Sequence, residues 1–304
     1  MKYRVRHLTR YRYAEAVTNS QHDLHLLPRD LPWQRCESAS LEIKPAPSVY
    51  QERIDYFGNR AAHVVLASAH AELLVIAHSR VEVLVPPTHP PEQDVNWEAA
   101  VAEIARDCGQ PQVQEMTFPS TYVVPWNALR AYAQASFPAG QPVLQGCLDL
   151  MARVHGDFTY DPKATTIATP LGEVFSKRRG VCQDFSHLML ACLRSLGLAA
   201  RYVSGYLVTT PPPGKPRLLG ADASHAWLSV FSPRFGFVDL DPTNNVVAAD
   251  QHITLAIGRD FGDVTPMRGV LLGGGRHQLN VSVDVSPVDV SPVDVSPANP
   301  VEFS

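Results

Sequence analysis

The chain has 304 residues, a hydrophobic fraction of 45%, a charged fraction of 18% and a formal net charge of −4. These values indicate an ordinary globular protein, exclude a disordered or fibrous chain, and argue against nucleic-acid binding as a main role. The length suggests two domains. No segment has the roughly 20 apolar residues that span a bilayer, and no apolar signal segment follows the basic N-terminal residues, so we expect a cytoplasmic protein without a membrane partner.

The five cysteines are odd in number, widely scattered, and contain no Cys-x-x-Cys pair. This pattern disfavours both a disulfide framework and a structural zinc site. We therefore expect free thiols, and we expect neither a cofactor nor a resident metal. The cysteines are Cys36, Cys108, Cys147, Cys182 and Cys192.

The first 88 residues are predicted to form a β-rich, sandwich-like domain. Residues 2–13 alternate aromatic or apolar side chains with basic ones, which indicates a half-buried strand with a cationic outer face. Further short β-like runs follow up to residue 85 without a helical pattern, and the turn Asp55-Tyr-Phe-Gly-Asn-Arg lies between two of them. Four prolines within residues 86–93 indicate a linker.

Helical patterns begin after this linker. Apolar stripes predict helices over residues 97–108, 129–137 and 142–154, and the strongest stripe predicts a helix from Cys182 to Leu196 that stops at Gly197. Strands are predicted after this helix, and a five-residue turn joins the second and third of them as a hairpin. These strands cover residues 200–207, 226–231, 235–240, 253–257 and 270–272.

The chain ends in three copies of Val-Asp-Val-Ser-Pro between Val283 and Pro297. A proline at every fifth position prevents a continuous ladder, so we expect a disordered tail in which only the first copy is able to finish a strand. The expected organisation is a β-rich domain over residues 1–88, a catalytic domain with its preceding helices over residues 89–282, and this tail over residues 283–304.

Cys182 is the candidate nucleophile. It lies in the first turn of the predicted helix, where free N–H groups and the positive end of the helix dipole favour a thiolate. The apolar stripe of the helix directs the thiol toward the interior. The alternative is that Cys182 is a small buried hydrophobic residue, which is the commonest role of a cysteine.

His225 and Asp241 lie on the two strands of the predicted hairpin. If its turn is centred on Arg234, Asp241 is a diagonal neighbour of His225 on the same sheet face, within reach of a hydrogen bond. Asp239 shares this face but lies further from His225, and a register error of one residue would reverse the faces. A thiol at a helix start, an imidazole on one strand and a carboxylate on the next are the groups of nucleophilic acyl transfer.

The segments around these residues resemble the transglutaminase-like core. Gly180-Val-Cys-Gln-Asp-Phe-Ser-His, Ser224-His-Ala-Trp and Leu240-Asp-Pro-Thr-Asn are similar to its three signature blocks, in the same order. The N-terminal region with its Asp55 turn, and the segment that starts at His252, resemble the regions that flank this core in bacterial members, which are often described as candidate cysteine proteases. Only the repetitive tail departs from the family.

This resemblance implies an α+β fold. A β-sandwich-like N-terminal domain would precede a papain/transglutaminase-like core, in which the catalytic helix packs on an antiparallel sheet. It also implies that Cys182 is the nucleophile, His225 the base and Asp241 the residue that orients His225.

The implied reaction is thioester chemistry on a protein or peptide substrate. Cys182 would attack a carboxamide or a peptide bond, release an amine, and pass the acyl group to water or to another amine. The oxyanion is expected to bind the backbone N–H of Cys182, with Gln183 and Tyr160 as candidates for a second donor. We favour hydrolysis or small-scale amide exchange, because nothing in the sequence resembles the acidic calcium sites of animal crosslinking enzymes.

Two other functions stay open at this point. Cys182, His225 and Asp241 are also legitimate zinc ligands, and the zinc content of the purified protein would distinguish a metal site from an acyl-transfer site. A catalytically silent binding module could instead use the β-rich domain and the loop at residues 211–216 as contact surfaces. An intact triad counts against this last function.

Overall fold

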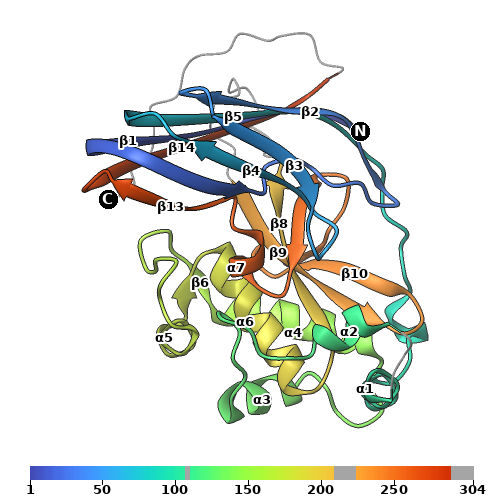
Figure 1. Ribbon diagram of the computed structural model, residues 1–304. Coiled ribbons are helices and arrows are strands. Elements are labelled where there is room, and N and C mark those ends of the chain that lie inside the picture. Colours follow the sequence, from blue (N-terminus) through green and yellow to red (C-terminus); the bar gives the residue numbers. More distant parts are fainter. Residues whose placement is uncertain (107–109, 209–223, 289–304) are drawn as a thin grey trace, which may run out of the picture.

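The computed structural model describes residues 1–106, 110–208 and 224–288. The chain forms three layers, in which a curled N-terminal sheet lies on one face of a five-stranded sheet and most helices lie on the other (Figure 1). The expected α+β fold is therefore confirmed. None of the described helices is both long and apolar enough to cross a bilayer.

The N-terminal sheet is built around one long strand, β1 (Lys2–Leu24). Its first half pairs with β5 and β14, and its second half pairs with β4 and β13. The sheet curls around its own apolar core, which includes Leu24, Val64 and Leu73 from different strands. The predicted sandwich-like domain is thus one curled antiparallel sheet, whose other strands are β2 (Gln34–Lys44), β3 (Val49–Ile54), β4 (Arg60–Leu66), β5 (His70–Val83), β13 (Met267–Gly273) and β14 (His277–Pro287).

The C-terminal strands differ from the expected division of the chain. Residues 267–287 pair with β1 and complete the N-terminal sheet, so the structure does not follow the predicted boundary at residue 282. Strand β14 includes the first repeat copy because Val283 and Val285 alternate with polar residues and are buried in the core. Pro287 stands at its last position, where a missing N–H is tolerated. The repeat copies after residue 288, like the loop at residues 211–216, lie outside the described residues.

The second sheet is antiparallel and has the order β11–β10–β9–β8–β12. Gly236 pairs with Ser232 and Leu240 pairs with Leu228, which is the hairpin register that the turn at Arg234 predicts. Strand β12 lies at one edge of this sheet. The strands are β8 (Ala200–Leu207), β9 (Ser224–Ser232), β10 (Gly236–Asp241), β11 (Val246–Val247) and β12 (His252–Gly258).

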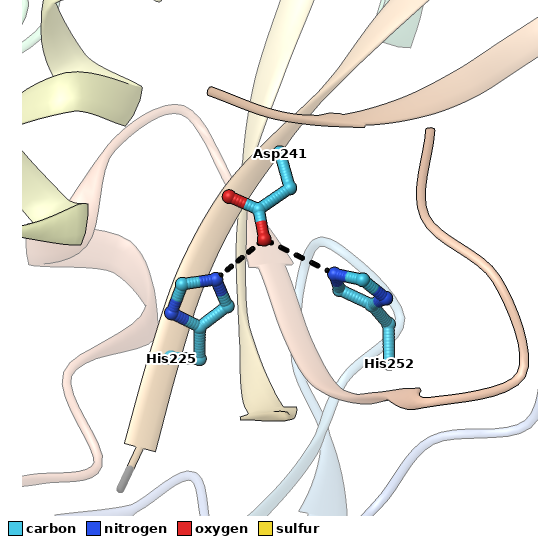
Figure 2. Close-up of side chains that lie close together, drawn as sticks. All are labelled: His225, Asp241 and His252. Carbon is cyan, nitrogen blue, oxygen red and sulfur yellow. Dashed lines mark hydrogen bonds and ion pairs between the residues drawn. The ribbon is translucent and has the colours of Figure 1, made fainter. Parts of the chain in front are cut away.

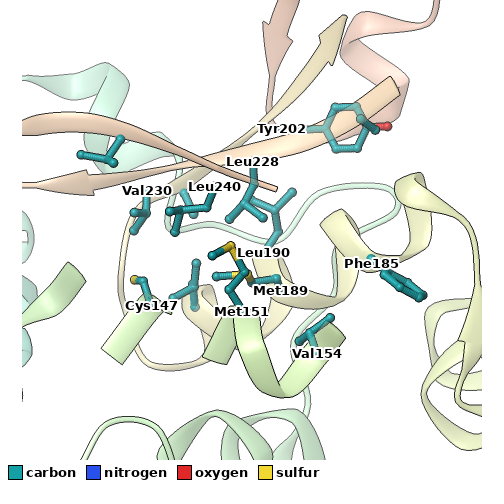
Figure 3. Close-up of a cluster of buried hydrophobic side chains, with 14 of the residues drawn as sticks. Cys147, Met151, Val154, Phe185, Met189, Leu190, Tyr202, Leu228, Val230 and Leu240 are labelled. Carbon is teal, nitrogen blue, oxygen red and sulfur yellow. The ribbon is translucent and has the colours of Figure 1, made fainter. Parts of the chain in front are cut away.

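Helix α6 (Cys182–Ser195) is the central helix of the molecule. Residues 184–194 are all buried, and the helix packs on β8 and β9 and against three other helices. Figure 3 shows part of this core, in which Met189 and Leu190 of α6 lie among side chains from α4 and from the sheet. Burial of each such side chain contributes about 1.5–3 kcal/mol. Gly197 ends the helix with a positive φ of 88°, as predicted.

The other helices surround α6. Helices α2 and α5 were not expected, since each is too short to show an apolar stripe. The predicted helix over residues 97–108 is observed to residue 105, and residues 107–109 lie outside the described part of the chain. The helices are η1 (Pro91–Gln93), α1 (Trp97–Ala105), α2 (Pro111–Glu115), α3 (Asn127–Gln134), α4 (Val143–Asp157), α5 (Leu171–Lys177) and α7 (Phe261–Val264), and a short two-stranded sheet is formed by β6 (Thr159–Tyr160) and β7 (Arg179–Gly180).

Candidate active site

The start of α6 is fixed by a carboxylate in its first turn. Asp184 accepts hydrogen bonds from the backbone N–H of Val181 at 2.8 Å and from the hydroxyl of Thr165 at 2.6 Å. An N3 carboxylate that reaches back to the N-cap residue satisfies one of the free N–H groups of a helix start. A Cβ at Gly180 would lie 2.8 Å from the Asp184 side chain, so a glycine is needed there. These contacts hold Cys182 at the first position of the helix.

Strand β9 brings His225 to this helix start. The Cys182 side chain is partly exposed, and it lies close enough to His225 to affect the pKa of the ring. His225 Nε2 lies 2.7 Å from Asp241 Oδ2, which leaves Nδ1 for the thiol (Figure 2). The three residues that the sequence singled out therefore lie near one another, with His225 hydrogen-bonded to Asp241 and within electrostatic reach of Cys182.

The two aspartates of β10 have different partners. Asp239 pairs with Ser229 across the hairpin and accepts a hydrogen bond from Trp227 Nε1 at 3.1 Å, whereas Asp241 contacts His225. This is the difference that the predicted register implied. Trp227 is fully buried and packs against Val203, Ala248 and Ile257.

Asp241 is fully buried and surrounded by donors. Its Oδ1 accepts hydrogen bonds from the backbone N–H groups of Thr243 and Asn244, and its Oδ2 accepts from Asn244 Nδ2 at 2.7 Å as well as from two imidazoles. Burial alone would raise the pKa of Asp241, but the bonds from His225, His252 and Asn244 outweigh it and hold the pKa well below its usual range. The carboxylate is therefore ionised at neutral pH.

The electrostatics of His225 favour its protonated form. Burial lowers the pKa of His225, but hydrogen bonds to Asp241 and Cys182 and the charges of both groups raise it to about 10. At neutral pH the ring is thus an imidazolium beside the carboxylate of Asp241.

His252 is a site residue that the sequence argument did not single out. It begins β12, is 7% exposed, and its Nε2 lies 3.2 Å from Asp241 Oδ2. It belonged to a segment with a family resemblance, but no spacing rule relates it to Asp241, because β12 lies at the far edge of the sheet from β10.

His225, Asp241 and His252 form a group with potential metal-ligating atoms within 4.8 Å of one another. This set differs from the set of the zinc hypothesis, because His252 takes the place of Cys182. The backbone N–H of Ala249 donates to His252 Nδ1 at 3.4 Å, so Nε2 carries the proton that faces Asp241. The donor arrangement therefore fits hydrogen bonding rather than metal ligation.

The two candidate oxyanion donors lie in different surroundings. Tyr160 is half-exposed, and the pairing of β6 with β7 places it opposite Gly180. Burial and the nearby charge of Cys182 raise the pKa of Tyr160, so its hydroxyl stays a donor within electrostatic reach of the thiol. Gln183 is partly buried in the first turn of α6, and among the described residues its side chain has no hydrogen bond to His225 or Asp241.

His187 of α6 contacts residues outside the group formed by His225 and Asp241. Its Nε2 accepts a hydrogen bond from the backbone N–H of Phe261, and its ring stacks on Tyr122. Burial lowers the pKa of His187 to about 4. It is therefore a neutral structural residue.

These observations define a transglutaminase-like core, with a cysteine at the start of a central helix and its partners on an antiparallel hairpin. Residues 3–82 match the bacterial transglutaminase-like N-terminal region, and residues 130–242 match the transglutaminase-like superfamily. The uncharacterized protein Rv2569c of Mycobacterium tuberculosis is 41% identical over 297 residues, which cover 94% of this chain and 93% of that protein. The chain belongs to the bacterial transglutaminase-like family.

Solved structures agree on the fold. A protein described as a candidate cysteine protease from Cytophaga hutchinsonii superposes with a TM-score of 0.75 at 18% identity, over 97% of this chain and 93% of that chain. A protein-glutamine gamma-glutamyltransferase of Pseudomonas aeruginosa is 30% identical over 105 residues, which are 32% of this chain and 16% of that enzyme. The general kind of protein is thus a transglutaminase-like one.

Proposed function

We propose that the protein is a cysteine-dependent acyl-transfer enzyme that acts on a carboxamide or a peptide bond of a protein or peptide substrate. The observation that carries this proposal is the position of His225, which is hydrogen-bonded to the buried, ionised Asp241 and lies within electrostatic reach of Cys182. A thiol, a base and an orienting carboxylate in this order are the parts of a nucleophilic triad.

The first half-reaction forms a thioester. The Cys182 thiolate attacks the carbonyl carbon, and the carbonyl π electrons move to the oxygen. The backbone N–H of Cys182 and the hydroxyl of Tyr160 are the proposed donors to this oxyanion. As the oxyanion collapses, the C–N bond breaks, and the imidazolium of His225 gives its proton to the leaving amine.

The second half-reaction regenerates the thiolate. Neutral His225 takes a proton from water or from an acceptor amine as that molecule attacks the thioester carbon, and the C–S bond breaks. Water as acceptor makes the enzyme a protease or amidase, and an amine makes it a transglutaminase. We favour hydrolysis or small-scale amide exchange. In both half-reactions Asp241 keeps the His225 ring in place and stabilises its positive charge.

Trapping of the thioester tests this proposal. The protein is incubated with glutamine-containing peptides and quenched in acid, and its intact mass and released ammonia are measured. We expect an acyl adduct that maps to Cys182, is absent from Cys182→Ala, and persists in Cys36→Ala, which removes another free, partly exposed thiol. The proposal would be overturned if neither an adduct nor released amine were found and Cys182 were no more reactive than Cys36.

A further inference from the structure

The ring of His252 lies between a backbone donor and a carboxylate acceptor. The Ala249 N–H points at Nδ1, and protonation of Nδ1 would break that contact, so the proton resides on Nε2. Nε2 faces Asp241 Oδ2. The titratable groups near the ring are Asp241 and His225, whose ring centroid lies 6.2 Å away, together with Asp239 and His89, which line the same small cavity.

Asp241 Oδ2 lies between two imidazoles, with His225 on one side and His252 on the other (Figure 2). Its other oxygen is fixed by the backbone of the turn that follows β10. Rotation of the carboxylate toward or away from His225 would thus break the contact with His252. This arrangement fixes the direction in which Asp241 accepts from His225.

His252 is in turn positioned by the N-terminal sheet. Strand β12 is an edge strand, and its free backbone groups are bonded by side-chain amides from that sheet. Gln34 Nε2 donates to the carbonyl of Thr254 at 2.7 Å, and Gln34 Oε1 accepts from the Thr254 N–H at 2.8 Å. Asn59 makes the same pair of bonds with Ile257, both at 2.8 Å. We call these four bonds the amide contacts.

The amide contacts rest on rigid supports. Gln34 Nε2 also donates to the carbonyl of Arg29 at 2.8 Å, and Asn59 is fully buried and accepts from Arg29 Nη1. Asp55 holds Asn59 through bonds to both its N–H and its Nδ2. The turn Asp55-Tyr-Phe-Gly-Asn therefore presents a fixed amide to the edge of the second sheet.

We propose that His252 is a positioning residue of the acyl-transfer site, that it fixes Asp241 against His225, and that the N-terminal sheet fixes His252 through Gln34 and Asn59. The effect of His252 on catalysis rests on the proposed function. The structural claim, that His252 fixes Asp241 against His225, does not depend on it. It gives the N-terminal sheet a role in building the site.

Two substitutions at one position test the inference. His252→Leu removes the donor and keeps an apolar side chain, whereas His252→Gln keeps a neutral N–H donor. The measured quantity is the ratio of the Cys182 alkylation rate by iodoacetamide at pH 6 to that at pH 9. An ordinary thiol with a pKa of about 8.5 reacts poorly at pH 6, so a high ratio indicates that the imidazolium of His225 assists Cys182. A loss of folded protein that is equal at both pH values lowers both rates and leaves the ratio unchanged. We expect His252→Leu to lower the ratio about tenfold and His252→Gln to keep it within about threefold.

Imidazole NMR of the same proteins separates this inference from the proposed function. In the unmodified protein, the ¹⁵N shifts should show His252 as the neutral Nε2–H tautomer, and the opposite tautomer would overturn the inference even if no variant folds. In His252→Leu the pKa of His225 should fall, because Asp241 is less firmly held. If this variant folds and the pKa of His225 is unchanged, the inference is also overturned. If the pKa of His225 depends on residue 252 but the protein forms no thioester, the inference is upheld and the proposed function is refuted.

Discussion

The hairpin that carries His225 and Asp241 and the contact between the two sheets differ in how far apart in the sequence their partners lie. His225 and Asp241 are 16 residues apart, whereas Gln34 and Thr254 are 220 residues apart. A turn centre fixes every pair of a hairpin, so one local assumption determines the site geometry. No local rule relates an amide on one sheet to the edge of another. The relative positions of His225 and Asp241 therefore follow from local β geometry, whereas the contacts that support β12 join residues far apart in the sequence.

The largest expected effect is loss of the nucleophile. Cys182→Ala should lower amide turnover by at least about three orders of magnitude, because no other thiol begins α6 beside His225. Turnover of a glutamine peptide measures it, and Cys36→Ala is the matched control with full activity. Equal losses in both variants would place the reactive thiol elsewhere.

The next effect separates the two aspartates of the hairpin. Asp241→Asn should lower the alkylation rate of Cys182 at neutral pH by about 10²–10⁴-fold, because an amide cannot balance an imidazolium and can stabilise the wrong tautomer. Asp239→Asn should cost less than about tenfold, since Asp239 contacts Trp227 instead of His225. Rate against pH in both folded variants is the measurement. A stronger loss in Asp239→Asn would move the triad to the other carboxylate.

The long-range support should show itself mainly in stability. Asn59→Leu removes both bonds to Ile257 and leaves buried backbone groups of β12 unpaired, so it should destabilise the protein by about 3 kcal/mol. It should also lower the pH 6 to pH 9 alkylation ratio in the folded fraction. Denaturant unfolding measures the first effect. Gln51→Leu on the exposed strand β3 is the control and should change stability by less than about 0.5 kcal/mol. Equal stabilities of the two variants would show that the amide contacts do not hold the sheets together.

The smallest effect is expected at the end of the chain. A protein that ends at residue 288 should keep the melting temperature of the full chain, because β14 ends at Pro287. A protein that ends at Arg276 should melt at least about 10 °C lower, since it loses β14 and its buried Val283 and Val285. Calorimetry of both proteins would decide. A large loss in the longer one would show a packing role for the remaining repeat copies.

The sequence predicted the site where its signals are local. The stripe of α6, the stop at Gly197 and the turn at Arg234 each depend on neighbouring residues, and the structure has all three. The strand β14 was underestimated because its last residues belong to a proline-containing repeat, whereas the structure places Pro287 where the ladder ends. His252 was missed because β12 and β10 are not paired with each other, so no hairpin register relates His252 to Asp241.

Other differences have equally specific causes. The sequence predicts only short β-like runs up to residue 85, but Ser79 pairs with both Val5 and Ala39, so β5 is one continuous strand. Helix α5 has only seven residues and a single buried side chain, Val174, which gives no periodic signal. Tertiary contacts therefore determine both the length of β5 and the formation of α5.

The pairing of β1 has a consequence for the order of events during protein synthesis. Strand β1 is synthesised long before its neighbours β13 and β14, which are made only after residue 266. Until then one side of β1 is an open edge, which is prone to pairing with other chains. The support that the N-terminal sheet gives to β12 is completed only late in translation. We expect the nascent chain to need protection of this edge, and the Cys182 thiol to become reactive only after β12, β13 and β14 have been synthesised.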